Sequence, residues 1–241
     1  MNPTPATSIK AQTLQPDEDR IDSMERRNKR KENNDSFSTK YHASGAKENE
    51  PGSQCTVLKN LLGITSKEEI DEAEVKGYTD AFDYMITHFS SNQQLSVDDI
   101  NAIHGVFFGR IYAWAGKPRT VNLSKEGFLF PPAHFLGQSL QEVEDTILKP
   151  STPCHGTRKE VIEKIARVHL ELLFIHPYRE GNGRTARLVA TLMALQAGYS
   201  GFDWEVFYRR FDDYVKSIQT LDLILMCTLL DEALLGNDSL A

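Results

Sequence analysis

A twelve-residue stretch, residues 176–187 with the sequence HPYREGNGRTAR, constrains this chain more than any other feature. It places a histidine, a carboxylate, a Gly-Asn-Gly turn and three arginines between two apolar segments with helical periodicity. Glycines adopt backbone angles that other residues avoid, so such a turn lets several backbone N–H groups point outward together. A helix beginning near Arg184 adds its own unpaired N–H groups and the positive end of its dipole, which favour an anion. The stretch therefore predicts a phosphate-binding loop between two helices.

The polar residues of this loop suit the chemistry of a phosphate ester. Arg184 and Arg187 lie three residues apart, which places them on one helix face, and their planar donor forks match phosphate oxygens. A lone carboxylate beside phosphates, here Glu180, commonly holds Mg²⁺. His176 follows the preceding apolar helix, and an imidazole in this position can act as a general base at neutral pH.

The composition bounds the class of protein. A chain of 241 residues, of which 40% are hydrophobic and 25% charged, is long enough for one sizeable domain. The net charge of −7 argues against a general nucleic-acid-binding protein, and no apolar run reaches the length of a membrane span. The first eleven residues lack a secretory signal pattern. The three cysteines, Cys55, Cys154 and Cys227, fit no metal spacing and leave one over, so we expect a reducing cytoplasm.

Residues 1–50 differ from the rest of the chain. They are rich in Pro, Ser, Thr, Asn and charged residues and nearly lack large apolar side chains. Such a segment does not bury enough apolar surface to fold alone, so we predict a disordered or extended N-terminal arm. From Pro51 the composition is globular, and we predict one domain over residues 51–241.

Helical periodicity dominates that domain. We expect helices from about Ser66 to His88, over residues 96–109, 135–148 and 158–175, after the phosphate loop up to Gly198, and over residues 203–214 and 221–235. In the first of them, Glu72, Glu74 and Lys76 are assigned to the solvent face. His104 is expected to be a packed or half-exposed helix residue rather than a metal ligand, and His169 is expected to pack in the core. The predicted fold class is all-α with one short hairpin.

The hairpin is predicted from Val121 to Phe130. Val121 alternates with Leu123 and Phe128 with Phe130, on either side of a turn that carries Gly127. An isolated hairpin in a helical chain leaves its strand edges unpaired. One interpretation is that an extended peptide adds to this edge as a further strand, and the alternative is an ordinary surface hairpin.

Residues 176–187 resemble the signature of the Fic domain family, His-x-Phe-x-Asp/Glu-Gly-Asn-Gly-Arg-x-x-Arg. The resemblance extends over about residues 51–241: residues 58–64 resemble the opening of many Fic cores, Trp114-Ala115-Gly116 with Arg119 the turn before the hairpin, and residues 122–130 the target-binding flap. Tyr178 departs from the signature, where Phe is usual, and is tolerated if its hydroxyl finds a partner. The resemblance implies a helical bundle with a hairpin flap over the active site.

The resemblance also implies an activity, the transfer of AMP from ATP to a hydroxyl side chain of a target protein, with release of pyrophosphate. In that reaction His176 is the catalytic base and Glu180 the ligand of Mg²⁺, with ATP as the substrate. The implied nucleotide-binding residues are Gly181, Asn182, Gly183, Arg184 and Arg187. The implied target-binding flap residues are Val121, Asn122, Leu123, Gly127 and Phe128. The partner is a target protein with a Ser, Thr or Tyr hydroxyl.

Other activities stay open. Fic relatives resembling the Doc toxin phosphorylate their targets and carry Lys where this chain has Gly183, which argues against a kinase. Some relatives transfer other phosphate-linked groups with nearly the same signature. A catalytically silent module that binds a nucleotide or a partner is the alternative from a different class. The protein is expected to act either as a toxin in its own bacterial cell or as an effector delivered into a host cell.

The resemblance also implies how the activity is regulated. Fic enzymes are often restrained by a helix with the pattern Ser/Thr-x-x-x-Glu-Gly/Asn, whose Glu pairs with the second signature arginine, here Arg187. Residues 44–49 match this pattern through Ser44, Glu48 and Asn49, but Gly45 and the nearby Pro51 leave little room for a helix. A small separate inhibitory protein, resembling an antitoxin, is the alternative source of such a glutamate.

Overall fold

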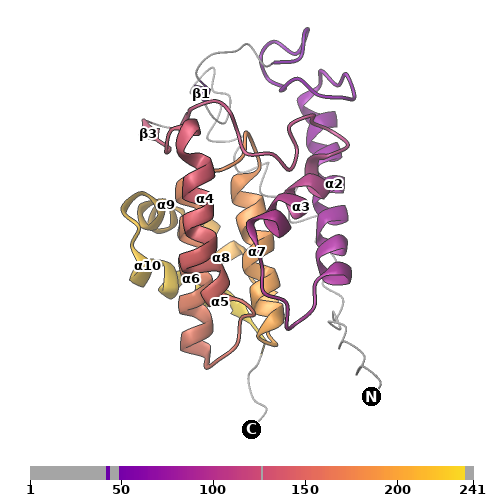
Figure 1. Cartoon of the computed structure of the whole chain (residues 1–241). Helices are drawn as coiled ribbons and strands as arrows, with labels where there is room; N and C mark the ends of the chain where they lie inside the picture. Colours follow the sequence, from indigo (N-terminus) through magenta and orange to yellow (C-terminus); the bar gives the residue numbers. More distant parts are fainter. Residues whose placement is uncertain (1–41, 44–48, 126, 237–241) are drawn as a thin grey trace.

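The computed structural model describes residues 42–43, 49–125 and 127–236, and the backbone of this part is mostly helical (Figure 1). The helices are α2 (Lys67–His88), α3 (Val97–Phe108), α4 (Leu136–Val143), α5 (Lys149–Ser151), α6 (Arg158–Ile175), α7 (Asn182–Gln196), α8 (Glu205–Arg209), α9 (Phe211–Thr220) and α10 (Leu223–Ala233). The strands are β1 (His42–Ala43), β2 (Leu123–Lys125), β3 (Phe128–Leu129), β4 (Gly201–Phe202) and β5 (Leu234–Leu235). The predicted fold class is confirmed.

Local signals set the helix ends. The Ser66 side chain accepts from the Glu69 N–H at the start of α2. Reciprocal capping boxes begin α3, through Ser96 and Asp99, and α6, through Thr157 and Glu160. These caps satisfy N–H groups that have no partner within the helix, which is why the predicted starts of these helices agree with the structure.

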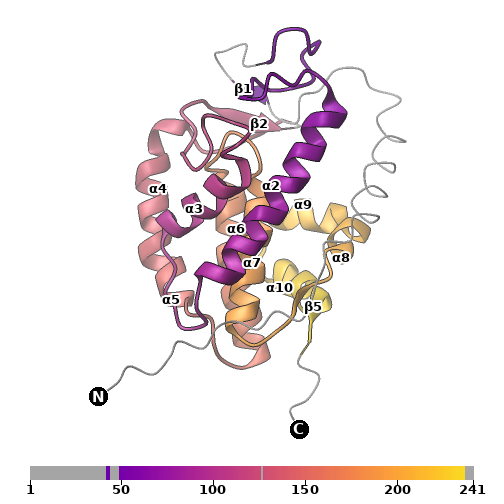
Figure 2. The same cartoon turned by 90° about the vertical axis from the view of Figure 1, so that its right-hand side faces the viewer.

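The helices α6 and α7 lie side by side in the middle of the bundle. Against them pack α2 and α3 on one side, α4 on another, and α10 on a third, as Figures 1 and 2 show from two directions. The helices α2 and α3 approach closely at Gly77, where an added Cβ would lie 2.0 Å from the Phe107 carbonyl oxygen. This crossing brings the middle of α2 next to the first turn of α7.

The closing region differs from the expectation of two helices. It contains α8, α9 and α10, and a two-stranded antiparallel sheet in which β4 pairs with β5. Strands of two residues do not show an alternating pattern in the sequence, so this pairing is decided by tertiary contacts.

The predicted hairpin is confirmed as the antiparallel pair β2 and β3, and it gains a third strand. The strand β1 pairs antiparallel with the other edge of β2, with His42 opposite Ser124 and Ala43 opposite Leu123. The sheet order is therefore β1-β2-β3, and β2 has a partner on both sides. Part of the predicted N-terminal arm thus lies on the hairpin.

Most of the remaining arm, including Ser44 and Glu48 of the possible inhibitory motif, lies outside the described residues. Asn49, its last residue, forms an isolated antiparallel bridge with Leu58. Within the described ranges, no helix is long and apolar enough to cross a membrane.

Candidate active site

His176 occupies the C-terminal end of α6 in a left-handed backbone conformation, with φ of 49°. Its side chain is buried, its ring stacks on Phe130 at 3.9 Å between centroids, and Nδ1 contacts the Leu173 carbonyl oxygen. A carbonyl accepts only, so Nδ1 carries the proton and the lone pair belongs to Nε2. Burial, with Arg119 and Lys125 nearby, lowers the pKa of His176 to about 3. The imidazole is therefore neutral at pH 7, the form that a general base requires.

Arg119 joins the signature loop to both ends of the hairpin. Its Nε donates to the His176 carbonyl oxygen at 2.7 Å, while Nη1 donates to Val121 at 2.7 Å and Nη2 to Pro131 at 2.6 Å. The backbone N–H of Arg119 donates to the Pro177 oxygen at 2.7 Å. The side chain is 4% exposed, and burial lowers its pKa to about 10. One guanidinium thus fixes the position of His176 relative to the hairpin.

The turn after His176 depends on Gly181 and Asn182. Gly181 has φ of 76°, and a Cβ there would lie 2.1 Å from Phe108 Cε2, so both conformation and packing require glycine. The Asn182 side chain donates to the Tyr178 carbonyl oxygen at 2.8 Å and accepts from the Tyr178 N–H at 2.7 Å. These two bonds make Asn182 a clamp that closes the loop, and its contact with phosphate stays a prediction.

Tyr178 anchors the loop in the core. Its hydroxyl donates to Asn101 Oδ1 at 2.8 Å, which supplies the partner that the departure from Phe requires. Its ring stacks on His104 at 3.7 Å between centroids. His104 is fully buried, accepts from the Gly116 N–H at 2.8 Å and donates through Nε2 to the Glu180 carbonyl oxygen at 3.1 Å. Of the two expected positions, packed or half-exposed, His104 occupies the packed one, and it also supports the loop.

Glu180 and Gly183 border the N-terminus of α7. The Glu180 carboxylate is buried, accepts from the Gly181 N–H at 3.0 Å and lies 3.8 Å from Arg184 Nη2. A Cβ added at Gly183 would meet no atom of the described residues within 4 Å, so a ligand can approach the first turn of this fifteen-residue helix. The predicted start of this helix is near Arg184, and the structure begins it two residues earlier, at Asn182.

Arg184 is paired with a residue that was assigned to solvent. Its Nη1 lies 2.7 Å from Glu74 Oε2, and Glu74 is 8% exposed. The Tyr112 hydroxyl donates to Glu74 Oε1 at 2.7 Å. The assignment of Glu74 to the solvent face is therefore wrong. The spacing held a usable signal, because Glu74 falls four residues after Ile70 and three before Gly77, both on the buried stripe of α2.

Arg187 is held by aromatic side chains of the closing region. Its Nη1 donates to the Tyr208 hydroxyl at 2.7 Å, and its guanidinium lies over the rings of Trp204 and Tyr208, at 5.6 and 5.2 Å from their centroids. Among the described residues, its Nε has no hydrogen-bond partner. Arg184 and Arg187 arise from one helix face as predicted, but they are fixed by different elements, α2 and α8.

Of the predicted flap residues, Leu123 is 2% exposed and its side chain belongs to the core. Asn122 accepts from the Ala133 N–H at 2.8 Å, and Gly127 forms the turn with φ of 82°. Val121 and Phe128 are partly exposed. Leu129 on β3 is 77% exposed, and it is not among the five flap residues named above.

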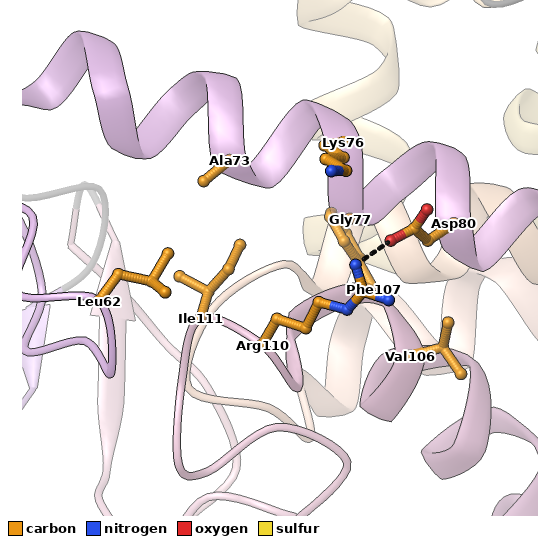
Figure 3. A pocket seen from close by; sticks show the side chains of 9 residues that line it. All are labelled: Leu62, Ala73, Lys76, Gly77, Asp80, Val106, Phe107, Arg110 and Ile111. Carbon is orange, nitrogen blue, oxygen red and sulfur yellow. Dashed lines mark ion pairs between the residues drawn. The ribbon is translucent and has the colours of Figure 1, made fainter.

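A cavity of about 190 Å³ lies between α2 and α3, and it is separate from the loop (Figure 3). Its lining is apolar except for Lys76 and an ion pair in which Arg110 Nη1 lies 3.6 Å from Asp80 Oδ2. Phe107 lines this cavity and also lies beneath the Arg184 guanidinium, at 5.0 Å from the ring centroid. The Phe107 side chain therefore lies between the cavity and the candidate site.

Comparisons with known proteins agree with this arrangement. The sequence model of the Fic/DOC family matches residues 94–194. The protein adenylyltransferase VbhT of Bartonella schoenbuchensis is 29% identical over 167 residues, which cover 69% of this chain and 34% of VbhT. The probable protein adenylyltransferase y4lH of Sinorhizobium fredii is 29% identical over 158 residues, 65% of this chain and 80% of that protein. The chain thus spans about a third of the length of VbhT.

Solved structures share the fold. The N-terminal Fic domain of a Bartonella effector protein from Bartonella sp. AR 15-3 has a TM-score of 0.66 at 20% identity, over 78% of this chain and 90% of that domain. The type IV secretion system effector protein BepA has a TM-score of 0.64 at 23% identity, over 78% of this chain and 68% of that one. With the loop, the hairpin and the helical bundle in place, the chain contains a domain of the Fic/DOC family.

Proposed function

We propose that this protein is an adenylyltransferase that transfers AMP from ATP to a hydroxyl side chain of a target protein. The observation that carries the proposal is the neutral, buried His176, fixed beside a helix N-terminus that bears Glu180, Arg184 and Arg187. Two findings support it. The relatives VbhT and y4lH are named as adenylyltransferases, and a BepC protein of Bartonella tribocorum with 22% identity was solved with bound AMPPNP.

The chemistry assigns one proton transfer to this chain. His176 Nε2 accepts the proton of the target hydroxyl, whose oxygen then forms a bond to the α-phosphorus of ATP, while the bond to the β-phosphate oxygen breaks. A pKa of about 3 keeps the imidazole unprotonated, and the negative phosphates of a bound nucleotide would raise it toward the value that suits proton transfer. Arg184 and Arg187 would stabilise the charge on the leaving pyrophosphate.

Glu180 is the residue that would hold Mg²⁺. The described residues contain no group of three or more His, Cys, Asp or Glu that could hold a metal, so this ion would take most of its ligands from phosphate oxygens and water, as Mg²⁺ commonly does. Bound there, Mg²⁺ would neutralise charge on the phosphates.

The target would bind at the outer edge of β3. With β2 in the middle, β1 and β3 are the outer strands of the described sheet, and β3 is the one that leads directly into the residue beside His176. Phe130 follows β3 directly and stacks on His176, which places this edge beside the proposed base. An added strand would bring a Ser, Thr or Tyr hydroxyl near Nε2.

An inhibitory glutamate is proposed to reach Arg187 from a separate small protein. In the described part of the chain, no carboxylate forms an ion pair with Arg187, and its Nε lacks a hydrogen-bond partner. Glu48→Gly tests the alternative source within this chain: an increase in self-labelling would assign the inhibition to residues 44–49.

Labelling with radioactive ATP tests the function. The protein with Mg²⁺ and ATP labelled at the α-phosphate is expected to label a protein, and His176→Ala is expected to abolish this, because the base is lost. Label transferred from the γ-phosphate alone would make the protein a kinase. ATP binding without any transfer would make it a silent nucleotide-binding module.

The nature and location of the target need a second readout. Mass spectrometry of bacterial and eukaryotic lysates incubated with the protein and ATP would give the added mass and the modified residue. An added mass other than AMP contradicts the proposed nucleotide, and the lysate that contains the target separates a toxin from an exported effector.

A further inference from the structure

We propose that Glu74 is a positioning residue, which holds the Arg184 guanidinium ready for the phosphates of the nucleotide. The inference rests on the proposed function, because it assigns Arg184 to phosphate binding. It adds to that function a residue from α2, well outside the signature loop. Three observations support it: the contact itself, the support of Glu74, and the surroundings of Arg184.

The contact is short and largely shielded from water. Arg184 Nη1 lies 2.7 Å from Glu74 Oε2, and the side chains of the two residues are 27% and 10% exposed. An arginine side chain loses considerable rotamer entropy when it is fixed, so an unrestrained guanidinium at the start of α7 would have to be ordered by the nucleotide itself. A carboxylate that fixes it beforehand removes part of that cost.

Glu74 is itself fixed from the opposite side. Tyr112 is 3% exposed, and its hydroxyl donates to Glu74 Oε1 at 2.7 Å. Burial and the negative charge of Glu74 raise the pKa of the Tyr112 phenol, which keeps this hydroxyl a hydrogen-bond donor at every relevant pH. The carboxylate therefore uses one oxygen for Tyr112 and the other for Arg184, and its orientation is determined.

The rings around Arg184 complete the restraint. Its guanidinium carbon lies 5.0 Å from the Phe107 centroid and 5.3 Å from that of Phe108. Phe108 is the side chain that forbids a Cβ at Gly181, so the same aromatic wall shapes the turn and supports the arginine. Glu180 faces the guanidinium at 3.8 Å from Nη2. If Mg²⁺ binds Glu180, that attraction weakens, and Glu74 is the carboxylate that still holds Arg184.

The test compares Glu74→Gln with the wild-type protein. The substitution keeps the shape of the side chain and removes its charge. We expect affinity for ATP, measured by calorimetry with Mg²⁺ present, to fall on the order of 10-fold, because the nucleotide must then order the Arg184 side chain itself. Binding of adenosine, which has no phosphate, is expected to be unchanged. Tyr112→Phe is expected to change ATP affinity in the same direction by a smaller factor.

A matched control lies on the same helix. Asp80→Asn breaks the ion pair with Arg110 at the separate cavity, and it is expected to bind ATP like the wild type. In an Arg184→Ala background, Glu74→Gln is expected to cause no further loss, because Glu74 acts through Arg184.

Several outcomes would overturn the inference. If Glu74→Gln lowers the melting temperature and leaves ATP affinity unchanged, the pair is merely structural. If Glu74→Gln binds ATP more tightly, Glu74 holds Arg184 away from the phosphates. If Glu74→Gln fails to fold, unchanged ATP affinity in Tyr112→Phe has the same meaning. A wild-type protein that binds no ATP would instead refute the proposed function.

Discussion

Three buried histidines surround the loop, and each is neutral for the same physical reason. Burial lowers the pKa of His104 to about 4, of His169 to about 3 and of His176 to about 3. Only His176 is at the loop end with a proposed chemical role. His169 bonds to the Ala186 carbonyl oxygen and the Tyr214 hydroxyl at 3.1 and 3.0 Å, and so it packs in the core as predicted.

These residues make the stability of the fold depend on pH. Below pH 6.5 the unfolded chain binds protons that the folded chain does not, so stability falls as pH decreases from 6.5 toward the folded pKa. A pKa lowered from 6.5 to about 4 corresponds to about 3 kcal/mol over that window for His104. We expect His104→Gln to reduce the slope of the free energy of unfolding between pH 6.5 and 5, measured by urea denaturation. His155→Gln alters an exposed histidine and is the control. An unchanged slope in His104→Gln would contradict this account.

At the scale of elements, the hairpin has one edge of interest. The Phe130 N–H donates to the Leu123 carbonyl oxygen at 3.1 Å, and Ser124 is opposite Leu129. Since hydrogen-bonded and non-hydrogen-bonded pairs alternate in an antiparallel ladder, the N–H and C=O of Leu129 point outward from β3. The side chain of Leu129 faces solvent. This one residue therefore presents both the main chain and an apolar side chain to an added strand.

Leu129→Pro tests that edge. Proline removes the outward N–H without removing a hydrogen bond of the β2–β3 ladder, so we expect target modification to fall at least about 10-fold while ATP affinity stays at the wild-type value. Leu129→Ala keeps the N–H and is the matched variant; its smaller loss would measure the side chain alone. Equal activity of Leu129→Pro and the wild type would exclude strand addition at β3, and lost ATP binding would make the hairpin structural.

At the scale of the whole molecule, the candidate site is formed where several distant segments of the chain meet. Arg184 is fixed by α2, Arg187 by α8, and His176 by the hairpin through Phe130 and Arg119. A nucleotide bound to all of them connects regions that are distant in sequence. Its binding free energy therefore adds to the stability of the entire bundle rather than to one loop.

Thermal unfolding measures that linkage. At an ATP concentration of 100 times Kd, with Mg²⁺, stabilisation of about 2.7 kcal/mol is expected, which corresponds to a rise in Tm of roughly 5 °C or more. Arg187→Ala is expected to lose most of this rise. Arg167→Ala, which breaks an exposed ion pair with Glu163 on α6, is expected to keep it. The same rise in both variants would place the nucleotide away from Arg187.

The sequence alone determined the features that depend on neighbouring residues. The capping boxes at Ser96 and Thr157 act over three residues, and the order of histidine, turn and arginines in residues 176–187 is a local pattern. Helical periodicity likewise identified the core faces of α6 and α7. Each of these signals depends on short-range backbone geometry, which a sequence displays directly.

Tertiary structure decided the contacts between distant segments. Glu74 lies buried against Arg184 because α2 crosses α3 closely at Gly77, and Arg119 reaches carbonyl oxygens of two separate loops. The pairing of β1 with β2 involves only two residues of each strand. A charged side chain is buried where an oppositely charged partner compensates it, and the two become neighbours only when the helices pack. Helical periodicity can indicate which face of a helix is buried, but it does not identify the partner residue on the other helix.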